Sequence, residues 1–230
     1  MTAPMTAPIP APIPAPMTTP RASYPAIASA SAREAWMLIA GVAAVLIWSA
    51  IAPNDRLTWF MEVIWVLAAF PLLLLTHRRF PLTRLLYWLI AIHCIILIYG
   101  GKYTYALTPL GDWARTVFDL QRNNYDRLGH LAQGFIPAIL ARELLLRCTP
   151  LQRGGWLFYL VCAACLSFSA FFEFIEWWAA VLLGGDADAY LATQGDIWDT
   201  HWDMFLALCG AIIAQLTLAR LHDRQLGRAS

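Results

Sequence analysis

The chain consists of long apolar segments separated by short polar connections. Six apolar segments of similar length follow one another, each close to the roughly 20 residues that a helix needs to cross about 30 Å of hydrocarbon. They are Ala35–Ala52, Trp59–Thr76, Leu82–Gly100, Tyr125–Leu146, Gly155–Leu183 and Trp198–Leu221. Unpaired backbone groups are costly in lipid, and the alternating pattern of a barrel is absent, so all six segments are predicted to be helices.

Composition supports a membrane protein. Of the 230 residues, 60% are hydrophobic and 13% are charged, and the mean hydropathy is +0.56. These values lie outside the usual range of soluble domains. The formal net charge is +1 and the arginines are scattered, which argues against nucleic-acid binding. We therefore predict an all-α, polytopic membrane helical bundle over residues 33–224, in contact with membrane lipid. Whether it binds other proteins is left open by the sequence.

Both ends of the chain are predicted to lie in the cytoplasm. Residues 1–32 repeat Ala, Pro and Thr, which predicts a disordered tail, partly in polyproline II conformation. Residues 225–230 form the predicted end of the C-terminal tail. With the N-terminus inside, the inner connections carry eleven Arg residues and the outer ones five Arg or Lys residues. Because Lys and Arg favour the cytoplasmic side, an N-in, C-in topology is predicted.

The last three spans carry ionisable residues at helical spacing. Charged groups are costly inside a membrane, so such residues are candidates for function. Spacings of three, four and seven residues place side chains on one face of a helix. The sets are Asp126, His130 and Gln133 in the fourth span, Glu173 and Glu176 in the fifth, and Asp196, Asp199 and Asp203 in the sixth if that helix has begun by Asp196.

The predicted topology brings these three sets toward one side of the membrane. The fourth and sixth spans begin outside and carry their acids early, whereas the fifth ends outside and carries its acids late. Six carboxylates in low dielectric repel one another unless something compensates their charge. Three hypotheses follow: a metal or catalytic site, a proton or ion pathway, or structural pairing with residues such as Arg127.

The leading hypothesis is an outward-facing metal site that hydrolyses a lipid-linked or envelope substrate. Its metal would lower the pKa of a bound water, with one acid as general base. Arg122 and Arg127 near the mouth would hold a phosphate. The cofactor is not identified beyond a divalent metal ion. The catalytic candidates are Asp126, His130, Glu173, Glu176, Asp199 and Asp203, and the metal-ligand candidates are His130, Glu173, Glu176, Asp196, Asp199 and Asp203.

A transporter would need a polar path to the cytoplasmic side. The inner halves of these spans are almost uncharged, which counts against such a path. A structural or partner-binding protein without catalysis is the third alternative. It predicts that acid-to-amide changes lower stability rather than an activity.

Other polar residues have simpler interpretations. His93 is expected to be a hydrogen-bonded core histidine, and His201 faces away from Asp199 on the helical wheel. Glu62 either joins the acidic set or faces the headgroups. Arg142 and Glu143 are interpreted as a charge pair at the inner end. The five cysteines lie in or beside apolar runs and are expected to be packing residues.

Three polar-rich blocks carry a family resemblance. They are NNYDRLGHLAQGF from Asn123, FFEFIEWWAAVL from Phe171 and TQGDIWDTHWDMFLALCGA from Thr193. On these blocks the chain resembles the YjdF-like family of bacterial inner-membrane proteins of unknown function. The resemblance implies a multi-pass location in the bacterial inner (plasma) membrane and places seven of the residues above on motif positions. It implies no activity.

Overall fold

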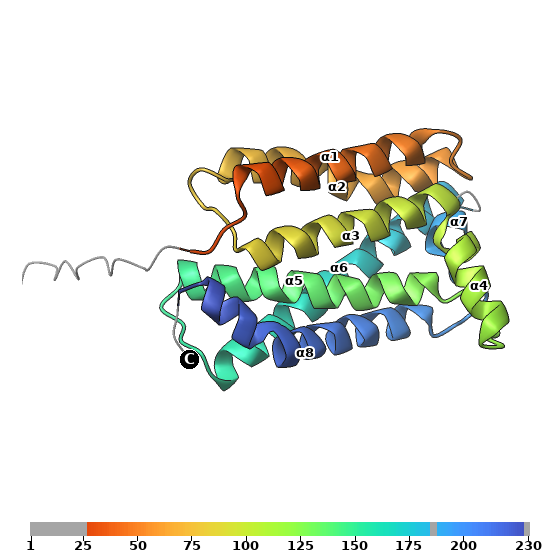
Figure 1. Cartoon of the computed structure of the whole chain (residues 1–230). Helices are drawn as coiled ribbons and strands as arrows, with labels where there is room; N and C mark the ends of the chain where they lie inside the picture. Colours follow the sequence, from red (N-terminus) through yellow and green to blue (C-terminus); the bar gives the residue numbers. More distant parts are fainter. Residues whose placement is uncertain (1–26, 185–187, 228–230) are drawn as a thin grey trace, which may run out of the picture.

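The chain folds into a bundle of long helices that run back and forth along one axis (Figure 1). In this computed structural model, residues 27–184 and 188–227 are described. The long helices are α1 (Ala32–Ala50), α2 (Arg56–Thr76), α3 (Arg84–Tyr103), α5 (Tyr125–Cys148), α6 (Gly155–Leu183) and α8 (Asp199–Gln225). Each corresponds to one predicted span, and no strand occurs in the described ranges. The prediction of an all-α membrane bundle is confirmed.

Short elements join the long helices at one end, shown on the right of Figure 1. They are the 3₁₀ turn η1 (Tyr105–Leu107), α4 (Pro109–Val117) and α7 (Asp188–Leu191). We call this end, where α5 and α8 begin, the site end, and we call the other the basal end. In α4 the apolar Trp113 and Val117 are exposed, as expected for a short amphipathic helix on the membrane surface.

Local sequence signals fix the ends of several helices. The side chains of Ser31 and Asp55 accept hydrogen bonds from the backbone N–H groups of Glu34 (3.2 Å) and Thr58 (2.6 Å), which caps α1 and α2. The bond from Thr58 lowers the pKa of Asp55. At its other end, α6 stops at Gly184, whose φ of +61° is readily adopted by glycine.

The outward faces of the helices are suited to lipid. Large apolar side chains such as Trp36, Leu75 and Leu182 are mostly exposed. Among the described residues, five helices are long and apolar enough to cross a membrane: α1, α2, α3, α6 and α8. The fourth predicted span, α5, is 24 residues long but more polar. It packs against α3, α6 and α8, and this enclosure explains why its sequence need not be as apolar.

The contact between α5 and α8 is the closest in the bundle, and the two helices lie side by side in Figure 1. A Cβ atom at Gly134 would overlap the carbonyl group of Ala207, and one at Gly210 would overlap the carbonyl oxygen of Leu131. The two backbones therefore touch midway along the pair, as small residues allow in membrane bundles. No space for a polar path remains between α5 and α8 at this level.

A second set of buried polar residues lies at the basal end. We call Thr83, Arg142, Glu143, Arg147, His222 and Asp223 the basal network. Glu143 is fully buried and accepts hydrogen bonds from the Thr83 hydroxyl (2.8 Å) and from Arg147 (2.6 Å). Arg142 Nη2 lies 2.8 Å from an Asp223 oxygen. The predicted pair of Arg142 with Glu143 is therefore wrong, because adjacent helical residues point about 100° apart and meet different partners.

His222 completes the basal network as a neutral side chain. Arg142 Nη1 lies 2.9 Å from His222 Nδ1, and Nε2 of the same ring lies 3.0 Å from a Glu143 oxygen. A guanidinium group has only donors, so Nδ1 must accept and Nε2–H must donate to the carboxylate. The basal network is thus a set of hydrogen bonds and ion pairs that links the start of α3 to α5 and α8.

The ends of the chain are described in part. Residues 1–26 of the predicted tail and residues 228–230 lie outside the described ranges. Ahead of α1, the backbone N–H of Ala28 donates to Gln225 (2.8 Å) and its carbonyl accepts from Arg84 (2.9 Å). Of the five free cysteines, Cys94, Cys162 and Cys165 are buried as expected of packing residues, whereas Cys148 is exposed. Cys162 accepts a hydrogen bond from Gln215 (3.3 Å).

Candidate functional site

The predicted polar residues of three helices meet at the site end. Asp126 and His130 come from α5, Glu173 and Glu176 from α6, and Asp203 from α8. We call these five residues the carboxylate–histidine cluster. Their convergence depends on the antiparallel order of α5, α6 and α8, as the sequence predicts. Apart from Glu176, which is half-buried, every member of the cluster is buried.

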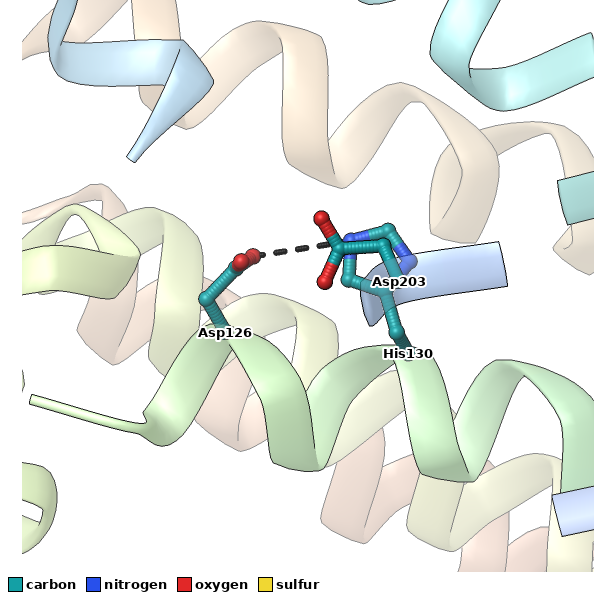
Figure 2. Close-up of side chains that lie close together, drawn as sticks. All are labelled: Asp126, His130 and Asp203. Atoms are coloured by element: carbon teal, nitrogen blue, oxygen red, sulfur yellow. Dashed lines mark ion pairs between the residues drawn. The ribbon is translucent and has the colours of Figure 1, made fainter. Parts of the chain in front are cut away.

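His130 lies at the centre of the cluster, and its two ring nitrogens face different carboxylates. Nε2 is 3.6 Å from an Asp126 oxygen and 3.8 Å from an Asp203 oxygen. Figure 2 shows these three side chains pointing toward one another from α5 and α8. Nδ1 is 4.0 Å from a Glu173 oxygen. The imidazole therefore divides the cluster into an aspartate side and a glutamate side.

These separations are too long for hydrogen bonds. Four buried atoms of the cluster, Asp126 Oδ2, His130 Nδ1, Glu173 Oε1 and Asp203 Oδ1, have no hydrogen-bond partner. Leaving such atoms unpaired is costly, so each calls for a compensating group. Two ligand atoms that are each about 2.1 Å from a shared metal ion lie roughly 3 to 4 Å apart. The observed spacing on the aspartate side matches that geometry.

Two overlapping groups have the composition of a metal site among the described residues. The first is Asp126, His130 and Asp203, and the second is His130, Glu173 and Glu176. Within each group one ligand atom per residue lies within 4.8 Å of the others. Because His130 uses opposite nitrogens toward the two groups, one ion cannot bind both. An ion on Nε2 would leave Nδ1–H facing the Glu173 carboxylate, 4.0 Å away, on the side where a metal-bound histidine usually has a carboxylate partner.

A cavity of about 80 Å³ adjoins the cluster. It can hold several water molecules, since each needs roughly 10–15 Å³. Its walls come from α2, α3, α5, α6 and η1. The polar residues that line it are Glu62, His93, Tyr105, Asp126, His130, Gln133 and Glu176. Asp126, His130 and Gln133 all line it, so the predicted polar face of the fourth span is confirmed.

Glu62 belongs to this cavity rather than to the headgroup region. It is 4% exposed and hydrogen-bonds the Tyr105 hydroxyl. Burial raises the pKa of Tyr105, and the Glu62 carboxylate raises it further, so the phenol stays protonated and donates. The sequence left both positions open for Glu62. Its only signal is an acid near the start of an apolar helix, which does not reveal which way the side chain points.

Asp196 and Asp199 lie outside the cluster, at the start of α8, where both form ion pairs with arginines. Arg122 contacts Asp199 (2.7 Å) and Asp196 (3.4 Å), and Arg127 contacts Asp196 (2.7 Å). We call these four residues the arginine–aspartate cap. Structural pairing, one of the three hypotheses, describes the cap well. The two arginines of the cap are paired with its two aspartates, so their charges are already compensated without a bound phosphate.

The helical register that placed Asp196 on one stripe with Asp203 is wrong. α8 begins at Asp199, after positive φ values at Gln194 (+49°) and Gly195 (+81°). Asp196 sits in this turn, where its carboxylate accepts a hydrogen bond from the backbone N–H of Trp198 (2.9 Å). Such local bonding by Asp favours a turn over a helix. His201 is exposed and contacts the Trp198 ring, as its predicted outward position requires.

His93 and Tyr105 are the two polar residues of the cavity lining that sequence reasoning did not assign to a site. His93 lines the cavity, and its Nε2 atom is buried without a hydrogen-bond partner. Tyr105 follows the third span and reaches the cavity only because η1 turns back over the helices. A lone histidine and a tyrosine in a connection carry no spacing signal, so only the fold identifies them.

Comparison with known proteins decides the family. A family model described as "Predicted membrane protein (DUF2238)" matches residues 34–224. The chain belongs to this family. It is also 50% identical over 184 residues to the inner membrane protein YjdF of Escherichia coli strain K12, covering 80% of this chain and 88% of that protein. No solved structure matches the chain.

Family membership confirms the resemblance carried by the three polar blocks. The chain is a multi-pass protein of the bacterial inner membrane. The matched region includes the carboxylate–histidine cluster, the cap and the basal network, and it begins after the Pro- and Ala-rich segment.

Proposed function

We propose that the carboxylate–histidine cluster binds a divalent metal ion and uses it to hydrolyse a lipid-linked or envelope substrate. One observation carries the proposal. His130 Nε2 lies 3.6 and 3.8 Å from two buried aspartates, and each of these carboxylates retains an oxygen without a hydrogen-bond partner. A shared cation at this point would satisfy the unpaired atoms and offset the repulsion between the acids.

The residues divide into roles. Asp126, His130 Nε2 and Asp203 are the three protein ligands, a number that leaves a position for water in catalytic metal sites. Glu173 faces His130 Nδ1 from 4.0 Å and, once the gap closes on metal binding, would accept from Nδ1–H and orient the ring. We assign the general base to Glu176, which lines the same cavity as Asp126 and His130.

The chemical step adds water across one bond. The ion would activate a water, Glu176 would take a proton from that water, and the water's oxygen would then bond to the electrophilic carbon or phosphorus of an ester. The bond from that atom to the leaving oxygen then breaks. Glu176 returns the proton to the leaving oxygen, so the two products together contain the substrate and one water.

The middle of the bundle supports an enzyme over a transporter. The cluster and the basal network are separated by the α5–α8 contact, where Gly134 and Gly210 bring the backbones together. An ion pathway would need polar groups or water at this level. A site closed at its base instead suits chemistry on a molecule that arrives and leaves on one side.

Elemental analysis of the purified protein tests metal binding. Prepared without chelators, the wild type should carry one metal ion per chain, and His130→Ala should carry none because it removes the central ligand. Glu173→Gln should bind the ion roughly 10- to 100-fold more weakly, the usual effect of changing the group that orients a metal-bound histidine. His201→Ala is the matched control and should retain the metal.

Mass spectrometry of envelope lipids incubated with the protein tests hydrolysis. The metal-loaded wild type should deplete a lipid and release two products whose masses sum to that lipid plus water. Glu176→Gln should retain the metal and lose the reaction. A wild type that is metal-free, or that is loaded but leaves every lipid unchanged, would overturn the proposal.

A further inference from the structure

The cavity beside the cluster approaches the lipid-facing surface where one of its lining side chains is exposed, and we call this place its lateral opening. Phe168 of α6 is one of its lining residues and is also 43% exposed. On the other side of the cavity, α2 contributes Trp65, whose ring contacts Phe172 of α6 with centroids 6.1 Å apart. α2 packs along α3, and α6 packs along α5 and α8. In the described residues, aromatic rings rather than close backbone packing bridge α2 and α6.

The aqueous route to the same cavity is covered. Tyr105 and Tyr190 lie over it from η1 and α7 and are 5% and 4% exposed. Next to them, Asn123 and Gln194 exchange hydrogen bonds of 3.1 and 2.8 Å between the α4–α5 and α7–α8 connections. The arginine–aspartate cap ties the same connections together. A molecule that enters the cavity between α2 and α6 therefore has to displace fewer hydrogen bonds and ion pairs than one that enters through the connections at the site end.

The lateral opening lies at the depth of acyl chains. Phe168 is 13 residues after Gly155 and 15 residues before Leu183, so it is roughly 20 Å from either end of α6. The hydrocarbon core of a bilayer is about 30 Å thick, which places Phe168 near its middle. Glu176 lies two helical turns after Phe168, toward the site end, and is therefore closer to the depth of the ester groups of membrane lipids.

Besides the two unpartnered atoms of Asp126 and His130, two further polar atoms of the cavity lining lack hydrogen-bond partners. They are Nε2 of His93 on α3 and Nε2 of Gln133 on α5, both buried. The Gln133 amide is a donor, and His93 Nε2 donates in one neutral tautomer. The ester or phosphoester oxygens of a lipid are acceptors that would satisfy them. The apolar rings of Trp65 and Phe172 offer no such bonds and suit a hydrocarbon chain.

We propose that a membrane lipid reaches the cluster laterally, with an acyl chain between α2 and α6 at Trp65 and Phe172 and its polar group at His93 and Gln133. The substrate class is therefore a lipid carrying an ester or phosphoester near its glycerol or headgroup. This inference rests on the proposed function, because the cluster is where the labile bond would be cleaved.

Photolabelling tests the lateral opening without relying on the metal. The protein is placed in vesicles of phosphatidylethanolamine and phosphatidylglycerol containing phosphatidylglycerol with a diazirine in one acyl chain. After irradiation, labelled residues are identified by mass spectrometry. Leu97 and Phe172, which line the cavity, should be labelled in addition to exposed residues. Leu86 and Val161 are buried elsewhere and should remain unlabelled.

A cavity-filling variant sharpens this test. Leu97→Trp should abolish labelling of Phe172, whereas Ile95→Trp, at an exposed position of the same helix, should leave it unchanged. Thermal unfolding checks that both variants are folded. Label confined to exposed side chains of the wild type would overturn the lateral opening even if metal binds. Labelled Phe172 in a protein that binds no metal would support the opening and contradict the hydrolase.

Discussion

Buried ionisable side chains occur at both ends of the bundle, but they have different partners. Glu143 in the basal network accepts hydrogen bonds from Thr83, Arg147 and His222. In the carboxylate–histidine cluster, Asp126 and Asp203 each have an unpartnered oxygen. A satisfied buried charge stabilises the fold, whereas an unsatisfied one costs free energy unless a ligand binds. We therefore assign structure to the basal network and binding to the cluster.

A matched pair of Glu→Gln variants separates these two roles. Glu143→Gln should lower the free energy of unfolding by about 3 kcal/mol, because it leaves buried cationic partners uncompensated. Glu176→Gln should change it by less than about 1 kcal/mol in metal-free protein, since this half-buried side chain has no comparable network. Chemical denaturation in detergent measures both. Equal losses at the two positions would contradict the distinction.

Sequence reasoning predicted the residues of the cluster better than their individual roles. Periodicity placed Asp126 with His130 and Glu173 with Glu176, because each pair lies on one helix and spacing defines its face. It could not separate Asp203 from Asp196 and Asp199. That division depends on where α8 begins and on Arg122 and Arg127, which approach from another connection.

At the scale of elements, hydropathy located all six long helices to within a few residues. α5 is the informative case, since its polar face is tolerated through enclosure by α3, α6 and α8. The positions of η1 and α7 over the cavity could not be predicted. These short elements lack a periodic pattern, and their places are set by contacts such as Tyr105 with Glu62.

The α5–α8 contact makes a prediction at this scale. Gly134→Ala and Gly210→Ala should each lower the free energy of unfolding by about 1–3 kcal/mol, because the added methyl group meets backbone atoms that cannot rotate away. Gly41→Ala in α1 is the control. Its Cβ would meet nothing within 4 Å, so stability should stay the same or rise slightly. Thermal unfolding midpoints of the three variants decide the matter, and tolerance at Gly134 and Gly210 would refute close packing.

At the scale of the whole molecule, the arginine distribution predicts which way the bundle faces. The site end carries five of the sixteen Arg and Lys residues and the remaining eleven lie on the predicted inner side. This predicted orientation would place the carboxylate–histidine cluster toward the outer leaflet and the basal network toward the cytoplasm. Under the proposed function, the expected substrates are envelope lipids of that leaflet.

Reporter fusions test this orientation. A fluorescent protein fused to the C-terminus should fold and fluoresce in the cytoplasm, and alkaline phosphatase inserted between Gly184 and Thr193 should be active in the periplasm. Unfused cells and a cytoplasmic phosphatase provide the baselines. An active phosphatase at the C-terminus would reverse the topology and place the cluster on the cytoplasmic side.

The central claim is that His130 and its neighbouring aspartates hold a metal ion. X-ray absorption at the edge of the metal bound to purified protein tests this most directly, because it reports the ligand atoms. We predict one imidazole nitrogen and several oxygens at about 2.0–2.2 Å, with no sulfur, and loss of this signal in His130→Ala. A sulfur ligand from one of the five free cysteines, or a spectrum unchanged by His130→Ala, would contradict it.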